Sequence, residues 1–313
     1  MDILSIENIT KNYAAHTALN DVSMVIPEQS VFGLLGPNGA GKTSLIRIIN
    51  QITAPDKGKV FFNGKPLEPK HTEMIGYMPE ERGLYKKMEV GEQALYLAQL
   101  KGLSRKDASI KLKYWFEKFE LQSWWKKKVE ELSKGMQQKI QFIVTVIHEP
   151  KLLIMDEPFS GFDPINAILI RDEMLELKDK GSTIILSTHR MESVEALCTH
   201  IALINKSKKI LDGSVKDIRK TFKSNTYEIV YEGVAIGFAN ALWAGYELHD
   251  SKEEDGLMKA RVKLLNDNTA NNLLGALLPH VQIHSFVEVM PSMEDIFIMK
   301  VNEGEEKNKV NIN

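Results

Sequence analysis

The sequence contains very little cysteine. Cys198 is the only one among 313 residues, so no disulfide can form within the chain, which fits a reducing compartment such as the cytosol. An excess of one charge is also missing, because 40 Lys and Arg residues stand against 42 Asp and Glu residues, a net charge of −2. A nearly balanced chain gives no overall field that would favour an anionic membrane surface or nucleic acid. We therefore expect no nucleic-acid partner.

Long hydrophobic runs are missing as well. The most apolar stretch, "IQFIVTVIHEPKLLIMDEP", is interrupted by the polar residues and proline at 148–151, well before the length that crosses a bilayer. The first residues, "MDILSIENITKNY", lack the basic segment and apolar core of a signal peptide. These absences predict a cytoplasmic chain without a membrane span. A hydrophobic content of 43% is enough for a sizeable core and allows two domains.

The hydrophobic pattern divides the chain into segments of different character. Over residues 1–220, short β-branched runs alternate with amphipathic stretches, which predicts an α/β domain with a mainly parallel sheet. Residues 88–150 interrupt this pattern and predict an inserted helical subdomain. Residues 221–302 read strand, helix, strand, strand, helix, strand, the order of a small ferredoxin-like α+β accessory domain. The polar residues 303–313 predict a disordered tail. Strands of the first domain are expected at 3–9, 22–26, 31–35, 59–62, 152–155, 183–187 and 201–204.

The stretch "GLLGPNGAGKTSLI" carries the strongest chemical signal. It follows the predicted strand at 31–35, fits the pattern G-x-x-x-x-G-K-[ST] and leads directly into an apolar-periodic helix. The glycines let backbone N–H groups turn toward a β-phosphate, Lys42 adds positive charge, and the Thr43 hydroxyl can bind Mg²⁺. An ordinary glycine-rich turn is the structural alternative, which the flanking strand and helix disfavour. The predicted nucleotide-binding residues here are Gly36, Pro37, Asn38, Gly39, Ala40, Gly41, Lys42, Thr43 and Ser44.

Two acidic residues end a second apolar strand in "LLIMDEP". Asp156 can hold the shell of a Mg²⁺ ion, and Glu157 can polarise an attacking water. Downstream, "ILSTH" ends another strand on His189, which can donate a hydrogen bond to a γ-phosphate. Adjacent carboxylates are common in loops, and a single histidine is often structural. Neither motif alone predicts a catalytic role, and both indicate one only together with the phosphate loop.

The stretch "ELSKGMQQKIQF" predicts a second anion site. Ser133 suits the N-cap of a helix, and Gly135 removes a side chain within its first turn. The free N–H groups and positive dipole end of such a helix can hold a phosphate. The chain therefore carries two phosphate sites about ninety residues apart, where one nucleotide needs only one.

Together these motifs resemble the nucleotide-binding subunits of ATP-binding cassette (ABC) transporters over about residues 1–220. The matching segments are the phosphate loop, the signature "LSKGMQQ", the Walker B strand "LLIMDEP", the D-loop "SGFD" at 160–163 and the switch histidine His189. Tyr13 matches the aromatic residue that stacks on adenine in this family, with an ordinary surface tyrosine as the alternative. The resemblance implies a P-loop NTPase fold with an antiparallel β part at the N-terminus.

The resemblance also implies an activity and partners. ABC subunits bind ATP and Mg²⁺ and hydrolyse ATP to drive a separate membrane permease, so the chain is expected at the inner face of the cell membrane. Two cassettes pair head to tail, here as an expected homodimer, and the signature of one closes on the ATP of the other. Ser133 and Gly135 would then bind the partner's nucleotide, which accounts for the second phosphate site.

The family's catalytic and metal-binding roles fall on defined positions. Lys42, Glu157 and His189 are the expected catalytic residues, and Thr43, Asp156 and Glu80 are the expected Mg²⁺ ligands. Glu80, in "IGYMPEERGLY", replaces the usual glutamine, and its carboxylate can still bind the metal. Arg82 is expected to offset part of the added negative charge.

Further departures from the family pattern affect the signature and bear on the direction of transport. Lys134 replaces the first glycine of the usual LSGGQ, and either adds charge near the phosphate or points to solvent; Met136 replaces the glutamine. The variants "PEERGLY" and "LSKGMQQK", with the C-terminal domain, are similar to the NatA-like branch of sodium and drug exporters. That similarity implies export and leaves the cargo open.

Alternatives remain for one segment and for the function. "SWWKKKVEEL" either touches the permease or lipid headgroups, or forms a subdomain surface with solvated lysines. The alternative function is a soluble ABC-type ATPase whose ATP-dependent dimerisation controls a non-transport partner. A module that binds ATP without hydrolysing it is disfavoured by Glu157 and His189.

Overall fold

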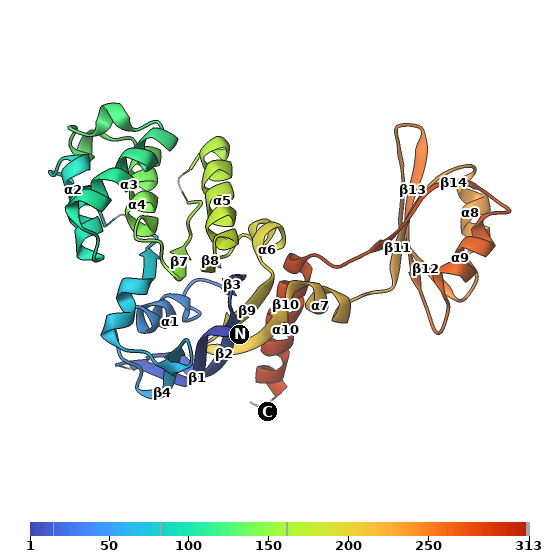
Figure 1. Cartoon of the computed structure of the whole chain (residues 1–313). Helices are drawn as coiled ribbons and strands as arrows, with labels where there is room; N and C mark the ends of the chain where they lie inside the picture. Colours follow the sequence, from blue (N-terminus) through green and yellow to red (C-terminus); the bar gives the residue numbers. More distant parts are fainter. Residues whose placement is uncertain (15, 82, 161, 311–313) are drawn as a thin grey trace. The chain divides into compact units, whose positions relative to one another are not determined.

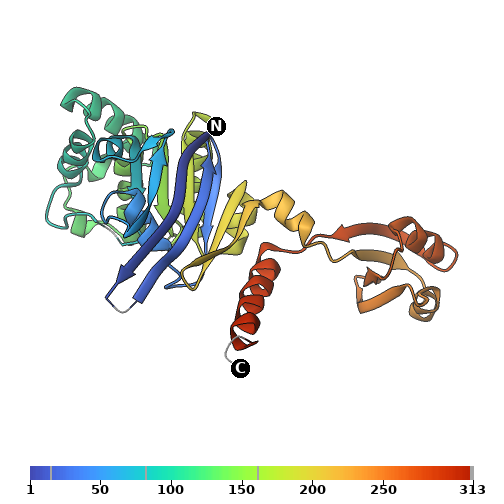
Figure 2. The ribbon, with the colours of Figure 1, turned by 90° about the horizontal axis from the view of Figure 1, so that it is seen from below.

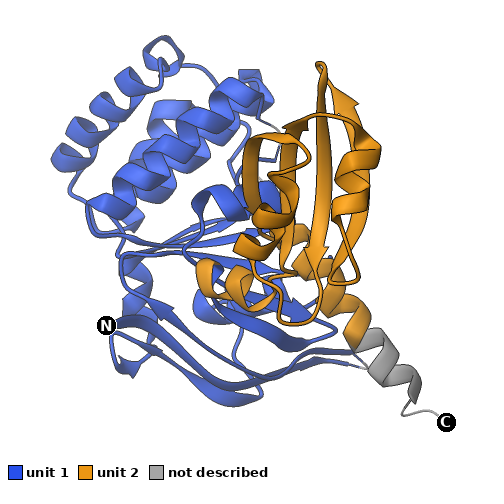
Figure 3. Cartoon of the chain, turned by 90° about the vertical axis from the view of Figure 1, so that its right-hand side faces the viewer, with its two compact units in different colours: residues 1–215, 312 blue, residues 216–311, 313 orange. Residues whose placement is uncertain are grey.

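The structure is a computed structural model that describes residues 1–14, 16–81, 83–160 and 162–310. The chain forms two compact units that divide between Val215 and Lys216 (Figure 3). The sequence predicts this boundary five residues later, at 220. Among the described residues, no helix combines the length and the apolar character needed to cross a membrane.

A six-stranded, mainly parallel sheet forms the centre of the first unit (Figure 1). Its order is β10-β9-β3-β8-β7-β6, and only β10 runs antiparallel to its neighbour. Every residue of β3, β7 and β8 is buried, as expected for parallel strands covered on both faces. The carboxyl ends of these strands meet at one edge, where open α/β sheets bind ligands. The strands are β3 (Val31–Leu35), β6 (Ile75–Met78), β7 (Leu152–Asp156), β8 (Thr183–Thr188), β9 (His200–Asn205) and β10 (Lys208–Ser214).

An antiparallel sheet at the N-terminus lies beside the central sheet (Figure 2). Its order is β2-β1-β4-β5, and its strands are β1 (Asp2–Tyr13), β2 (His16–Pro27), β4 (Lys57–Phe62) and β5 (Lys65–Pro66). Helix α1 (Lys42–Ile49) buries Leu45, Ile46, Ile48 and Ile49 in one core cluster with strands of both sheets. Burying each such side chain contributes about 2 kcal/mol, so this core fixes the helix that begins at the phosphate loop.

The predicted helical subdomain contains three helices, α2 (Val90–Leu100), α3 (Arg105–Lys118) and α4 (Lys134–Val146). Its core includes Trp115, whose ring lies 5.7 Å from that of Phe119 and 6.0 Å from that of Phe142. The ring of Trp125 lies 4.9 Å from that of Phe116 and fills the space over Gly91. The 3₁₀ helices are η1 (Pro69–Met74), η2 (Gln122–Trp124) and η3 (Val129–Glu131), and α5 (Pro164–Asp179) and α6 (Met191–Leu197) complete the unit.

The second unit has the predicted ferredoxin-like order of elements. Its antiparallel sheet, β12-β13-β11-β14, carries α8 and α9 on one face (Figure 1). The elements are β11 (Thr226–Glu232), α8 (Ala235–Ala241), β12 (Tyr246–Glu254), β13 (Leu257–Leu264), α9 (Ala270–Leu277) and β14 (Gln282–Val289). Helix α7 (Val215–Thr221) precedes them, and its Arg219 donates a hydrogen bond to the Pro291 carbonyl just before α10 (Met293–Val310).

Helix α10 differs from the predicted disordered tail at 303–313. It runs to Val310, and residues 311–313 lie outside the described chain. The helix is anchored by Met293 and Ile296, which are buried. Residues 303–310 are rich in Glu and Lys, which have high helix propensity and extend a helix once it is nucleated.

Candidate functional site

The phosphate loop connects β3 directly to α1, as the sequence predicts. Gly36 has φ +147°, and a Cβ at this position would collide with the carbonyl oxygen of Ile204 on β9. Only glycine avoids both the strained backbone and the collision. The loop is therefore held close to the sheet, and the N-terminus of α1 opens into the cleft at the carboxyl ends of the strands.

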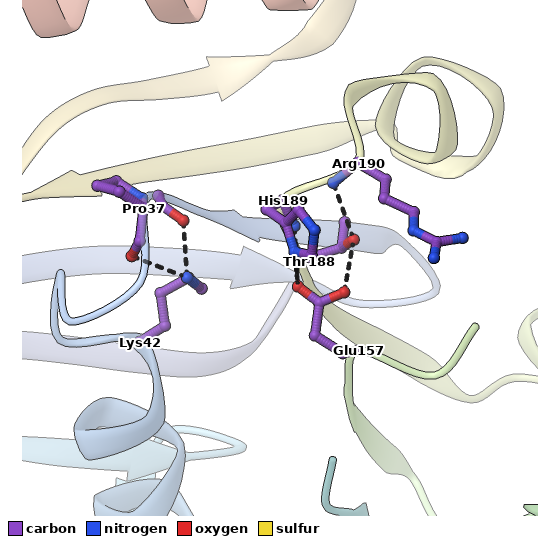
Figure 4. A network of polar contacts seen from close by, with 7 residues as sticks. Pro37, Lys42, Glu157, Thr188, His189 and Arg190 are labelled. Carbon is purple, nitrogen blue, oxygen red and sulfur yellow. Dashed lines mark hydrogen bonds and ion pairs between the residues drawn. The ribbon is translucent and has the colours of Figure 1, made fainter. Parts of the chain in front are cut away.

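Lys42 is buried in this loop, with 8% of its surface exposed. Its Nζ donates hydrogen bonds to the carbonyl oxygens of Gly36, at 2.7 Å, and Pro37, at 3.1 Å (Figure 4). Burial lowers the pKa of the Lys42 ammonium, while the carboxylates of Glu157, Asp156 and Glu80 act in the opposite direction. A cation thus lies near three carboxylates, with two of its three N–H donors bonded to loop carbonyls.

Glu157 lies at the end of β7 in a left-handed backbone conformation, with φ +49°. One carboxylate oxygen, Oε1, lies 2.6 Å from Nδ1 of His189 and accepts a hydrogen bond of 3.0 Å from the His189 N–H. The other, Oε2, accepts one of 3.2 Å from the hydroxyl of Thr188 (Figure 4). A left-handed backbone conformation costs a non-glycine residue about 1 kcal/mol or more. The hydrogen bonds from His189 and Thr188 offset this cost and keep Glu157 in that conformation. The sequence predicts Glu157 and His189 here and misses Thr188.

Asp156 and Glu80 bring further negative charge to the same place. Burial raises the pKa of Asp156, and the nearby carboxylates of Glu80 and Glu157 raise it further. Such a cluster is unfavourable unless positive charge is bound within it. Arg82, predicted to offset Glu80, lies outside the described residues.

These groups line one cleft of about 310 Å³. Eleven of the predicted residues lie there, namely Tyr13, Asn38, Gly39, Gly41, Lys42, Thr43, Ser44, Glu80, Asp156, Glu157 and His189. Gly36 and Pro37 contact Lys42 through their carbonyls, and Ala40, within the loop, is buried. His16 and Ala18 also line the cleft. The sequence does not predict them, because only the pairing of β2 with β1 brings them to the cleft.

Tyr13 lies at the rim of the cleft, at the end of β1. It pairs with His16 across the hairpin and is 39% exposed. The ammonium of Lys11 lies 5.4 Å from the centre of the Tyr13 ring, within the range of a cation–π contact. An exposed ring fixed on one side offers its other surface for stacking.

The signature residues do not line this cleft. Ser133 is the N-cap of α4, and its Oγ accepts a hydrogen bond of 3.3 Å from the N–H of Met136. Ser133 and Lys134 are exposed, and a Cβ on Gly135 would meet open space. The residues of the predicted second anion site therefore form an accessible helix start, apart from the phosphate loop of the same chain.

The other predicted loops have defined roles in the fold. In the D-loop, Asp163 caps α5 by accepting a hydrogen bond from the Asn166 N–H at 3.0 Å, and Gly161 lies outside the described residues. In "SWWKKKVEEL", Trp125 packs inside the helical subdomain, while the three lysines at 126–128 are exposed.

Comparisons with known proteins agree with this fold and cleft. Residues 19–160 match the ABC transporter family, and residues 213–301 match the C-terminal domain of DrrA1-3-like ATP-binding proteins. The chain is 38% identical to the ABC transporter ATP-binding protein YhaQ of Bacillus subtilis over 96% of this chain and 98% of that protein. It therefore belongs to the ATP-binding subunits of ABC transporters, ATPases that hydrolyse ATP for transport. Both the predicted family and the predicted fold class are confirmed.

Other relatives extend the similarity. The linearmycin resistance ATP-binding protein LnrL of Bacillus subtilis is 29% identical over 95% of this chain and 97% of that protein. NatA of Bacillus subtilis is 31% identical over 68% of this chain and 89% of that protein. A solved ATP-binding subunit of an ABC transporter superposes with a TM-score of 0.66 and 31% identity, covering 70% of this chain and 93% of that one. The relatives favour a transport partner over a non-transport one.

Proposed function

We propose that two copies of this chain pair head to tail and hydrolyse ATP between them to drive a membrane permease. The observation that carries this proposal is the position of the signature. Ser133 and Gly135 form an open helix start that does not line the cleft of their own chain, so their N–H groups and positive dipole end remain available to an outside phosphate. A second copy supplies such a phosphate in its own cleft.

The cleft suits the triphosphate of ATP. The N-terminus of α1 and Lys42 provide positive charge at its base, and Tyr13 provides an aromatic surface at its rim for adenine. The loop around them is held by Gly36, whose place no larger residue can take. We assign the residues at 36–44 to the phosphates, in the order that the phosphate-loop pattern gives them.

The donor set also fits Mg²⁺. Among the described residues, no three His, Cys, Asp or Glu side chains form a group that would hold a metal ion alone. Mg²⁺ usually binds through one or two carboxylates, substrate phosphates and water, and Thr43, Asp156 and Glu80 line the cleft beside the phosphate loop. We assign these three residues to the metal. When bound, Mg²⁺ would neutralise charge on the phosphates.

The catalytic roles follow from the network around Glu157. Its carboxylate accepts a proton from the attacking water, whose oxygen bonds to the γ-phosphorus as the bond to the β–γ bridging oxygen breaks. The products are ADP and inorganic phosphate. Lys42 and His189 stabilise the negative charge that develops on the phosphoryl oxygens, and Ser133 and Gly135 of the other copy add donors from the opposite side.

The contacts of Lys42 and Glu157 must change before this chemistry occurs. Lys42 donates to two loop carbonyls, and Glu157 is occupied by Thr188 and His189. Phosphate oxygens would replace the carbonyls at Lys42, and water would replace at least one donor at Glu157. Binding of ATP would thus rearrange the loop after β8, and this local change would start the domain motion by which we propose the pair drives the permease.

The relatives indicate the setting of the activity. LnrL is a linearmycin resistance protein and SrtF of Streptococcus pyogenes is a lantibiotic transport protein, and both relatives support export as the direction of transport. We propose a position at the inner face of the cell membrane, held there by the permease. The identity of the cargo would then be set by the permease.

ATP-driven pairing tests the proposal. The Glu157→Gln variant binds ATP without hydrolysing it, so a paired state should accumulate. Mass photometry at nanomolar concentration should show dimers only with ATP and Mg²⁺. Adding Ser133→Arg should leave monomers that still bind ATP. Dimers that persist with Ser133→Arg would contradict the head-to-tail arrangement.

A further inference from the structure

A glutamine side chain on α4 holds the loop that carries Glu80. Nε2 of Gln141 donates a hydrogen bond to the carbonyl oxygen of Pro79, at 3.0 Å, and another to that of Glu81, at 3.4 Å. Only the NH₂ end of a glutamine can bond to two carbonyl oxygens, because a carbonyl accepts hydrogen bonds and cannot donate them. One amide group therefore fastens the backbone on both sides of Glu80.

The backbone before Glu80 is also fixed by the sheet, whereas the backbone after it is not. Strand β6 ends at Met78, which is fully buried, and Pro79 follows with a φ angle that its ring restricts. The described residues between 79 and 88 form neither a helix nor a strand. The hydrogen bond to the Glu81 carbonyl thus acts where regular secondary structure gives no support.

The position of Glu80 matters because of its neighbours in the cleft. Its side chain lines the cleft together with Thr43 and Asp156, the two other residues that we assign to Mg²⁺. This ion demands near-ideal octahedral geometry, with ligand oxygens at about 2.1 Å. A displacement of the loop by a fraction of that distance would therefore weaken the contribution of the Glu80 carboxylate.

Packing alone does not account for a glutamine at position 141. The Gln141 side chain is 4% exposed, and none of the described residues donates a hydrogen bond to its buried Oε1. A buried acceptor without a partner is unfavourable, and an apolar side chain of similar shape would avoid it. The two donors of the amide, which reach the loop, explain this residue better than its fit to the core does.

A second glutamine on the same helix makes the same type of contact with another segment. Nε2 of Gln137, about one turn earlier in α4, donates to the carbonyl oxygens of Leu132, at 3.1 Å, and Val129, at 3.3 Å. These carbonyls belong to the segment that leads into α4, and Gln137 does not line the cleft. The chain therefore offers a matched control, with the same residue type, helix and bonding pattern.

We propose that Gln141 is a positioning residue of the metal site, which holds the backbone around Glu80 so that the carboxylate reaches Mg²⁺. This inference rests on the proposed function, because it requires Glu80 as a ligand of the metal that is bound with ATP. Gln141 does not line the cleft, so it acts on the metal only through the loop. Its loss should therefore have no further effect on metal binding where Glu80 is already replaced.

Binding of Mn²⁺ by the full chain with a non-hydrolysable ATP analogue, followed by electron paramagnetic resonance, tests this proposal. All proteins carry Ser133→Arg, so that pairing does not alter the measured affinity. Gln141→Met keeps the length of the side chain and removes both donors, and it should weaken Mn²⁺ binding about threefold or more. Gln137→Met should bind Mn²⁺ as tightly as the Ser133→Arg background.

The stability of the variant separates positioning from damage to the fold. The Tm of Gln141→Met should stay within about 2 °C of the background, because Glu80 and Glu81 are exposed and water can replace the amide at the freed carbonyls. Gln141→Ala, which cannot overfill the site, should weaken Mn²⁺ binding to the same extent.

The double variant Glu80→Gln with Gln141→Met decides the route of the effect. Its affinity for Mn²⁺ should equal that of Glu80→Gln alone. Losses that multiply would overturn the proposal, as would a Gln141→Met protein that binds Mn²⁺ like the background. If Glu80→Gln itself leaves Mn²⁺ binding unchanged, the metal site of the proposed function fails, and this inference fails with it. If Glu80→Gln weakens binding and Gln141→Met does not, only this inference fails.

Discussion

Nδ1 of His189 lies 2.6 Å from Oε1 of Glu157, so the end of β8 and the end of β7 are joined through their side chains. The backbone N–H of His189 donates to the same oxygen at 3.0 Å. In parallel strands these two ends are neighbours, and the contact gives the carboxylate a fixed orientation. The histidine thus orients the proposed base.

His189→Ala should reduce ATP turnover by roughly a hundredfold, because it removes a positioned donor and frees the carboxylate of Glu157. The affinity for ATP should change less than about threefold, since the His189 side chain is 62% exposed and Lys42 is untouched. Phosphate release and binding of a fluorescent ATP analogue measure the two quantities. A variant with wild-type turnover would show that His189 is structural.

Glu80→Gln should raise the Mg²⁺ concentration for half-maximal turnover by about three- to tenfold, because an amide oxygen is a weaker ligand for Mg²⁺ than a carboxylate. Glu81→Gln is the matched control. Glu81 is adjacent and exposed, and it does not line the cleft. Identical Mg²⁺ dependence of the two variants would remove Glu80 from the metal site.

Lys118→Met should destabilise the first unit. Nζ of Lys118, on α3, lies 2.7 Å from Oε1 of Glu173 and 2.8 Å from Oε2 of Glu176, both on α5. The Glu173 side chain is 6% exposed, so loss of the cation should cost about 2 kcal/mol and lower Tm by about 4–8 °C. Thermal unfolding followed by circular dichroism measures the change.

The control for this variant is Lys180→Met. Lys180 pairs with Glu176 at 2.6 Å from an exposed position, and such pairs contribute about 0.5 kcal/mol or less. Equal losses of stability in the two variants would contradict the role given to the buried carboxylate of Glu173.

Stability should fall between pH 7 and pH 5 because of His148. Burial, together with the positive charges of Lys101 and Lys111, lowers the pKa of His148 to about 4, from an ordinary value of 6.5. A lowered histidine pKa means that the unfolded chain binds the proton first. The contribution of neutral His148 to the free energy of unfolding is complete above pH 6.5. It is lost as the pH falls toward 4, and the loss is about 2 kcal/mol at pH 5.

His148→Gln should flatten this dependence. Chemical denaturation at the two pH values gives the free energies of unfolding, and the variant should lose about 2 kcal/mol less than the wild type. Parallel losses in both proteins would mean that other groups control the acid sensitivity.

Much of the site could be predicted because its residues are local in sequence. Strand β3 has the predicted bounds, and the glycine pattern that follows requires a phosphate loop. His16 and Thr188 were missed for different reasons. His16 reaches the cleft only through pairing with Tyr13, and Thr188 contacts Glu157 only because β7 and β8 are adjacent.

The missed elements are those with weak local patterns. Strand β6 is four residues long and contains a glycine, and β10 contains three charged residues and a glycine. Glycine and charged residues lower the strand propensity of both segments. Their position is determined by pairing with β7 and β9. The sequence does not predict helix α10 because residues 303–310 are polar, while its buried anchors, Met293 and Ile296, lie seven to ten residues earlier, in the first turn.

Mixing two inactive variants tests the central claim most directly, that the signature of one copy completes the site of the other. Lys42→Met disables the phosphate loop, and Ser133→Arg disables the signature. In a mixed pair, the intact loop of the second variant faces the intact signature of the first. Equal mixing should restore about a quarter of the wild-type ATPase rate, because half of the pairs are mixed and each has one complete site. A mixture as inactive as its components would contradict the account. If each signature served the phosphate loop of its own chain, neither variant would have a complete site in any pair.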